Sequence, residues 1–121
     1  MTAAAPTLAL HRRADVFTSE PGRAERLEKT REAVPLAPDE LLHPEVPAVY
    51  VVRRGKLRVS KFLENGAELT RAVLQAGAAF TTHAGDRDAD AADDAYILHD
   101  IILMALGEAE LWRLPPGALE A

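Results

Sequence analysis

The pair Asn65-Gly66 constrains the fold most, because it is the strongest short signal for a β-hairpin that a sequence can carry. Before it, residues 50–59 are rich in β-branched and aromatic side chains, and from Leu57 onward apolar and polar residues alternate. After it, residues 69–74 form a second such run that leads to a glycine. The pattern predicts two antiparallel strands joined by a type I′ turn, which needs positive φ at both central residues.

The segments beyond this hairpin also predict short strands. Four prolines between residues 34 and 47 exclude a long helix or a central strand and favour edge strands and corners. Residues 96–106 are apolar on both alternating faces, which favours one or two strands buried on both sides, or one buried face plus a subunit contact. A buried helix is the alternative for this run. Residues 108–114 predict a last strand, and the whole pattern predicts a mainly β, antiparallel double-stranded β-roll of the jelly-roll or cupin-like kind.

The N-terminal third predicts two further pieces. Residues 1–18 contain small residues and no sustained period, which predicts a flexible arm. Ser19 suits a helix N-cap and Pro21 suits the first turn, so residues 19–33 predict a short surface helix. A chain of 121 residues is long enough for one domain only. We expect residues 19–121 to form that domain, with the roll in residues 34–121.

Charge and composition exclude several classes of protein. The chain has no cysteine, so disulfides, thiolate metal sites and cysteine nucleophiles are excluded. Residues 1–62 hold 11 Lys/Arg and 8 Asp/Glu, whereas residues 63–121 hold 3 and 11, for a net charge of −5. That balance argues against autonomous binding to nucleic acid. The first residues do not read as a signal peptide and no run is long enough to span a membrane, so a cytoplasmic location is expected.

The order of these pieces resembles the β-roll effector domain of Crp/Fnr-type transcription regulators, which is also the cyclic-nucleotide-binding domain. The resemblance covers residues 34–119, and four motifs carry it: PLAPDELL, VYVVRRGKLRV, LENGAELTRAVLQAGAAF and ALGEAELWRLPPGAL. In the family's terms these are the opening corner, the central strand interrupted here by Gly55, the hairpin with its glycine–x–phenylalanine corner at Gly77 and Phe80, and the last strand. The resemblance implies a non-enzymatic regulatory or sensor domain.

The segment after Phe80 departs from the nucleotide-binding members of the family. There, a glycine–glutamate pair meets the ribose, and an arginine with a small hydroxyl residue holds the cyclic phosphate. Here Thr81, Thr82 and His83 are followed by an acidic run in which Arg87 is the only cation. A cyclic phosphate needs convergent N–H donors and an unpaired guanidinium, so the departure predicts that no cyclic nucleotide binds. No other cofactor is predicted.

Two sets of residues are candidate metal ligands. Asp86, Asp88 and Asp90 have the alternating spacing of a calcium loop, but Ala91 stands where such a loop has glycine. His83 and His99 are candidates for a cupin-like zinc or iron site, although no H-x-H pair accompanies them. A solvated acidic loop and isolated histidines are the favoured interpretations, so no metal site is predicted.

No catalytic constellation is present, and we predict no enzymatic activity. The only serines are Ser19, which suits a cap, and Ser60, which is expected on an exposed strand face. Basic residues run through the central strand. They indicate either contact with nucleic acid or an acidic partner, or a solvent-facing strand edge that their charges protect from pairing with other strands. This basic surface consists of Arg53, Arg54, Lys56, Arg58 and Lys61.

Regulation is expected to act through protein contact, with a second copy of the chain as a homodimer or with a full-length Crp/Fnr-type regulator. The expected interface residues are apolar and aromatic: Tyr96, Leu98, Ile102, Met104 and Trp112. Direct DNA binding by this chain alone is not expected, since the family's helix-turn-helix does not follow the roll. The alternatives are the N-terminal effector domain of a DNA-binding regulator, a metal-dependent cupin-like protein, and a small-ligand sensor with its pocket between Leu57, Val73 and Leu103.

Overall fold

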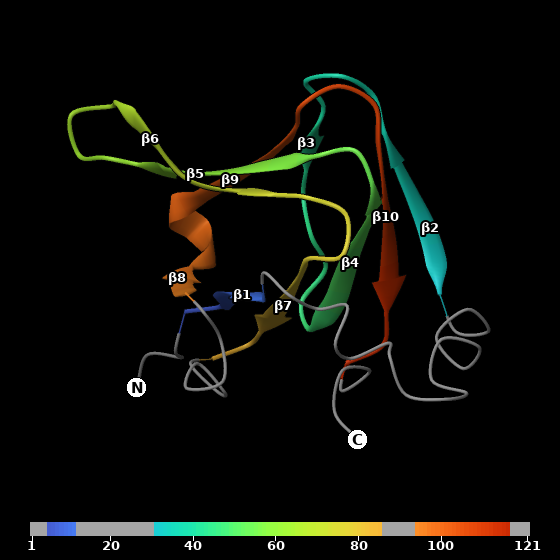
Figure 1. Cartoon of the computed structure of the whole chain (residues 1–121). Helices are drawn as coiled ribbons and strands as arrows, with labels where there is room; N and C mark the ends of the chain where they lie inside the picture. Colours follow the sequence, from blue (N-terminus) through green and yellow to red (C-terminus); the bar gives the residue numbers. More distant parts are fainter. Residues whose placement is uncertain (1–4, 12–30, 86–93, 117–121) are drawn as a thin grey trace.

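The computed structural model describes residues 5–11, 31–85 and 94–116, and more than half of these residues lie in strands (Figure 1). The elements in chain order are β1 (Thr7–His11), β2 (Glu32–Leu36), β3 (Leu41–Leu42), β4 (Ala48–Arg54), β5 (Leu57–Phe62), β6 (Glu68–Leu74), β7 (Ala79–His83), β8 (Asp94–Ile97), the 3-10 turn η3 (Leu98–Asp100), β9 (Ile101–Ala105) and β10 (Ala109–Leu114).

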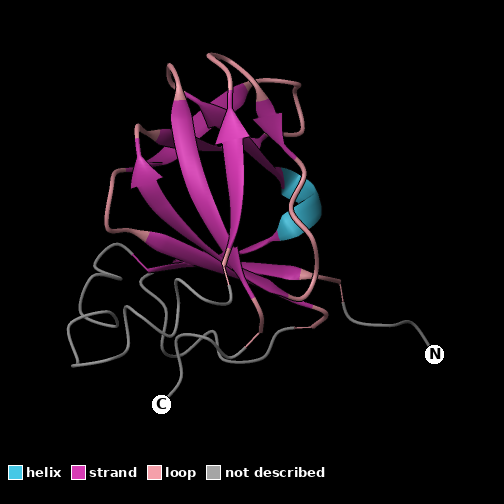
Figure 2. Cartoon of the chain, turned by 90° about the vertical axis from the view of Figure 1, so that its right-hand side faces the viewer, coloured by secondary structure: helices cyan, strands magenta, loops and turns pink. Residues whose placement is uncertain are grey.

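The strands form two sheets that enclose one core (Figure 2). One sheet has six strands in the order β2-β10-β4-β7-β1-β8, and the other has four in the order β3-β9-β5-β6. Every paired strand runs antiparallel to its neighbour. The largest fully buried side chains lie between the sheets, among them Tyr50, Phe80 and Leu57. The predicted antiparallel β-roll is therefore confirmed.

Gly55 is the point at which the chain passes from one sheet to the other. The motif around it was expected to be one interrupted strand, but β4 pairs with β10 and β7, whereas β5 pairs with β9 and β6. Gly55 has φ +80°, a conformation that a side chain disfavours. A sharp change of direction therefore separates two strands.

The hairpin between β5 and β6 is confirmed, but its turn type was predicted wrongly. Of the pair Asn65-Gly66, only Gly66 has positive φ, at +85°. Its N–H donates to the carbonyl of Leu63 at 3.0 Å. The Leu63 N–H donates to the Ala67 carbonyl at 2.8 Å, and the Asn65 side chain accepts from the Ala67 N–H. This is a three-residue loop, a type I turn followed by a left-handed glycine, which also permits the strands to keep their twist.

Two predictions for the N-terminal third need correction. Thr7–His11 form β1 between β7 and β8, with Leu8 and Leu10 fully buried, so an arm is the wrong description of these residues. The alternation of apolar and polar side chains in these residues is short, and the strands that pair with them lie far along the chain. Of the helix predicted over residues 19–33, residues 19–30 lie outside the described residues, and its last two, Glu32 and Ala33, belong to β2.

The proline-rich segment forms edge strands, as predicted. β2 and β3 each lie at the edge of a sheet, and Pro35 is tolerated in β2 because an edge strand needs no further donor on its open side.

The apolar run 96–106 divides into β8, η3 and β9. On β9 the buried residues Leu103 and Ala105 alternate with half-buried ones, so one face is buried and the other is partly exposed.

Candidate functional site

The outer face of the four-stranded sheet, meaning the side turned away from the core, carries a row of side chains that crosses all four strands. The register pairs Leu41 of β3 with Met104 of β9, Met104 with Arg58 of β5, and Arg58 with Val73 of β6. Leu41 and Val73 are 45% and 42% exposed. Because three of the four side chains in the row are apolar, this face differs from the polar outer face usual for an antiparallel sheet.

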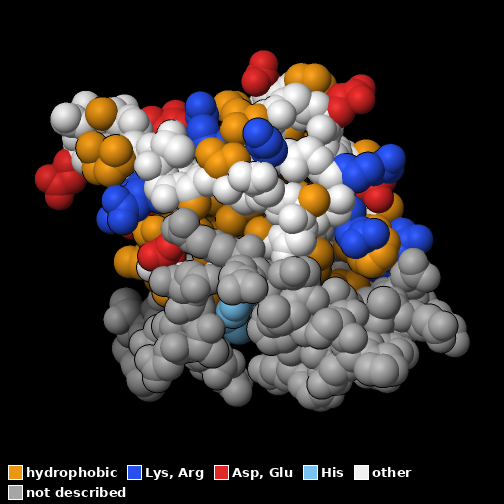
Figure 3. All heavy atoms as spheres, viewed as in Figure 1, with side chains coloured by type: hydrophobic (Ala, Val, Ile, Leu, Met, Phe, Trp, Pro, Cys, Tyr) orange, Lys and Arg blue, Asp and Glu red, His pale blue; other side chains and the backbone are white. Residues whose placement is uncertain are grey.

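A second part of the same face lies at the end of the β5–β6 hairpin. This hairpin projects from the rest of the described fold, at the upper left of Figure 1. Phe62 is 50% exposed there and pairs with Glu68 across the hairpin. In the space-filling view, hydrophobic side chains gather at this projecting end (Figure 3). Exposed apolar side chains grouped in this way mark interaction surfaces.

Arg58 stands in the middle of the row and is electrically neutralised. Its guanidinium donates to Glu68 at 2.9 Å and lies 3.9 Å from the sulfur of Met104. Its Nε is buried and has no hydrogen-bond partner. Ser60, which follows on β5 beside a β-bulge, is fully buried with an unpartnered hydroxyl, so its expected position on an exposed face is wrong.

The structure separates the five residues that were predicted to form one interface. Ile102 and Met104 lie on the outer face described above, half-buried between β3 and β5. Tyr96 and Leu98 instead pack against the core. Tyr96 accepts a hydrogen bond from Arg71 of β6 at 3.4 Å, which raises the pKa of that arginine. Trp112 lies on β10 of the other sheet.

The predicted basic surface is also divided. Arg53 and Arg54 end β4 in the six-stranded sheet, whereas Arg58 lies on β5 in the other. Lys56 is exposed in the connection between them, and Lys61 is half-buried on β5. Arg54 pairs with Glu110 at 2.6 Å, and this contact lowers the pKa of the glutamate. A continuous basic stripe therefore does not form.

The segment after Phe80 uses its side chains for internal bonds. The buried hydroxyl of Thr82 donates to the carbonyl of Glu45 at 2.6 Å, and the hydroxyl of Thr81 lies 3.0 Å from Nε2 of His83. His99 is exposed on η3. Asp86, Asp88, Asp90 and Arg87 lie outside the described residues. Within the described ranges, no three histidine or carboxylate side chains are grouped as metal ligands.

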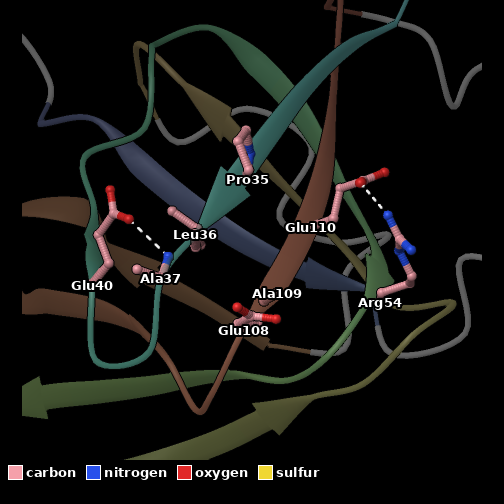
Figure 4. Close-up of a pocket in the computed structure, with 8 residues that line it drawn as sticks. All are labelled: Pro35, Leu36, Ala37, Glu40, Arg54, Glu108, Ala109 and Glu110. Carbon is pink, nitrogen blue, oxygen red and sulfur yellow. Dashed lines mark hydrogen bonds and ion pairs between the residues drawn. The ribbon is translucent and has the colours of Figure 1, made fainter.

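An open pocket of about 590 Å³ lies where the start of β10 meets the ends of β2 and β4 (Figure 4). Its apolar floor includes Leu36 and Ala109, while Glu40 accepts a hydrogen bond from the Ala37 N–H at 2.8 Å. The remaining lining residues are Pro35, Arg54, Glu108 and Glu110. Sequence patterns could not show this pocket, because it joins segments that are far apart along the chain.

The pocket that was expected inside the roll is not lined as predicted. Leu57 and Leu103 lie in the packed core, but Val73 points to the opposite face of its sheet and is exposed. The β-bulge does not alter this, since Val73 pairs with the outward-facing Arg58. These three side chains therefore do not surround a common cavity.

The fold is similar to that of solved Crp/Fnr-type regulators. The N-terminal domain of a transcriptional regulator from Streptomyces coelicolor A3(2) is 21% identical with a TM-score of 0.61, over 90% of this chain and 75% of that one. The CO-dependent transcription factor CooA from Carboxydothermus hydrogenoformans is 18% identical with a TM-score of 0.57, over 90% of this chain and 43% of that one. The catabolite activator protein of Thermus thermophilus is 17% identical with a TM-score of 0.61, over 86% and 47%.

The similarity is one of fold, and this chain spans less than half the length of the latter two regulators. No protein-family model matches the sequence, and no curated protein is similar to it in sequence. In residues 5–11, 31–85 and 94–116, no helix has the length and apolar character needed to cross a membrane.

Proposed function

We propose that this chain is a non-enzymatic regulatory domain of transcription control that acts by protein–protein contact and does not bind a cyclic nucleotide. The fold supports the regulatory class, since it is that of Crp/Fnr effector domains. The observation that carries the proposal is the partly exposed apolar row Leu41–Met104–Val73 on the outer face of the four-stranded sheet. A partner that covers this row would remove apolar area from water.

A second copy of the chain suits this face best. The chain carries a net charge of −5, so two copies repel each other unless they meet through a neutral surface. The row offers one, because its only charged member, Arg58, is paired with Glu68 within the same face. A two-fold axis through the row would place apolar residues of one copy against those of the other, the self-complementary arrangement typical of dimers.

The absence of cyclic-nucleotide binding is supported by the residues that follow Phe80. The hydroxyl of Thr82, in the segment where the family holds its phosphate, donates to the Glu45 carbonyl. To serve a ligand, the buried Thr82 hydroxyl would have to give up this hydrogen bond.

We expect the wild-type chain to have twice its monomer mass of 13.1 kDa by light scattering, and Val73→Asp to be monomeric with its unfolding temperature nearly unchanged. A charge at this exposed position would be buried without a partner in the dimer but remains solvated in the monomer. Ile97→Asp is the matched control, since Ile97 is 51% exposed on the six-stranded sheet and should leave the mass unchanged. A wild-type chain that is monomeric at all concentrations would contradict the proposal.

We also expect no change in the unfolding temperature with cyclic AMP or cyclic GMP. A ligand that binds only the folded state adds about 2.7 kcal/mol at one hundred times its dissociation constant, which is several degrees for a domain of this size. Such a shift with either nucleotide would show that the segment after Phe80 does hold a phosphate, and this part of the proposal would be wrong.

A further inference from the structure

Trp112 lies between two arginines on the side of the six-stranded sheet that faces away from the core. The Cζ atoms of Arg31 and Arg53 lie 4.4 Å and 4.0 Å from the centre of its ring. Trp112 pairs with Ala33 of β2 and Val51 of β4, and each arginine is two residues from one of these. Because β2 and β4 both run antiparallel to β10, the two guanidiniums reach the ring from opposite ends of that strand. We call these three residues the arginine–tryptophan stack.

The stack keeps a net positive charge, because its neighbouring carboxylate, Glu110, is already paired with Arg54. Arg54, Arg58 and Arg113 are each paired with a glutamate. Arg31 and Arg53 are exposed, and neither forms an ion pair within the described ranges. Lys and Arg side chains gather at the right of Figure 3, where Figure 1 shows β4, β10 and β2. The stack is therefore a fixed cationic feature on an acidic protein.

The indole N–H of Trp112 is a further buried donor, and Glu110 is its neighbouring carboxylate. Trp112 is 8% exposed, and its Nε1 is buried and has no hydrogen-bond partner. The main contact of Glu110 is Arg54, which lowers the pKa of this carboxylate. Arg31 and the indole lower the same pKa further. A buried donor that lacks a well-formed hydrogen bond costs free energy.

The geometry suits a carboxylate. Stacking on an aromatic ring uses the face of a guanidinium and leaves the N–H groups along its edge free. Those edges match the two oxygens of a carboxylate or phosphate. A nucleic acid is disfavoured, because the chain has a net charge of −5 and a pI near 5.3 and would repel a long polyanion. A short acidic protein segment brings the same chemistry with less repulsion.

We propose that Arg31, Trp112 and Arg53 form a docking site for carboxylate side chains on an acidic segment of a partner protein. The site goes beyond the self-association proposed above, since it lies on the other sheet and shares no residue with the apolar row. Loss of either interaction would leave the other intact, so the failure of one proposal can be told from the failure of the other.

Trp112 is the only tryptophan of the chain, so its fluorescence reports directly on the stack. We expect titration with an octa-aspartate peptide at low salt to change its emission in a saturable way, with weaker binding as salt rises. Arg53→Gln should weaken binding roughly ten-fold, as expected for loss of one charge-assisted hydrogen bond. Arg31→Gln together with Arg53→Gln should abolish it. Lys56→Gln is the control, because it removes one exposed positive charge that does not contact the ring.

Three results would overturn the proposal: no saturable change in emission, equal binding by the double variant, or tighter binding of a DNA oligonucleotide than of the peptide. Arg53→Lys keeps the charge, and it serves as a second variant if the glutamine variants do not fold. We expect it to bind more weakly than wild type, because lysine lacks the planar fork. Wild-type affinity in Arg53→Lys would show that charge alone attracts the peptide and would also overturn the site.

Discussion

Gly55→Ala is expected to lower the free energy of unfolding by about 3 kcal/mol or more, which is a large part of the stability of a small domain. A Cβ at this position would lie 2.4 Å from the carbonyl oxygen of Glu108 and 2.8 Å from the Cα of Ala109. Both are backbone atoms of the segment that begins β10, so they cannot move aside as the end of a flexible side chain could. Positive φ at Gly55 adds strain to the clash.

Two other glycines provide matched controls for this substitution. Gly66 and Gly107 have φ of +85° and +89°, close to the value at Gly55, but a Cβ at either would meet nothing within 4 Å. Their alanine variants should therefore lose only the conformational term, about 1 kcal/mol each. Urea unfolding followed by Trp112 fluorescence measures all three. Equal losses at Gly55 and Gly66 would show that the approach to β10 is not what requires the glycine.

The position of Gly55 also explains why the charged residues around it serve different surfaces. Arg53, two residues before it, joins the arginine–tryptophan stack, whereas Arg58, three residues after it, lies in the apolar row of the other sheet. Both surfaces therefore depend on the corner at which the chain changes sheets. A variant that distorted this corner would disturb both.

Local sequence patterns predicted those elements whose signals are themselves local. The hairpin follows from Asn65-Gly66, the edge strands from the prolines, and the last strand from the run that ends at Pro115. β1 was missed because five residues give too short an alternation to stand out. Its position depends on pairing with β7 and β8, whose paired residues lie 68 to 90 positions further along the chain. Only such long-range pairing makes Leu8 and Leu10 core residues.

The candidate surfaces were predicted less well than the fold, for a related reason. Alternation within a strand shows that Met104 and Leu103 point to opposite faces, but it does not show which sheet a strand joins. Ile102 and Met104 lie on one partly exposed face, whereas Trp112, which was grouped with them, lies in the other sheet. The stack of Trp112 with Arg31 joins residues that no pattern in the sequence connects.

Phe80→Ala is the second large effect we expect, a loss of about 3 to 5 kcal/mol. Phe80 is fully buried at the centre of the roll and stacks on Tyr50, with ring centroids 4.9 Å apart and planes 14° from parallel. Truncation would open a cavity in the core, on the inner face of β4 and β7, where Tyr50 and Phe80 are paired. The core around it is closely packed, so neighbouring side chains could fill the cavity only in part.

The loss should extend to the segment that precedes β4. The Tyr50 hydroxyl accepts the N–H of Glu45 at 2.9 Å, and Thr82, two residues after Phe80, donates to the carbonyl of the same residue. If Phe80 holds Tyr50 in place for these bonds, amide exchange at Glu45 should become faster in Phe80→Ala. Phe80→Leu is the control, because it keeps most of the volume and should cost about 1 kcal/mol. Equal stability of the two variants would mean that the stacked pair is not central to the core.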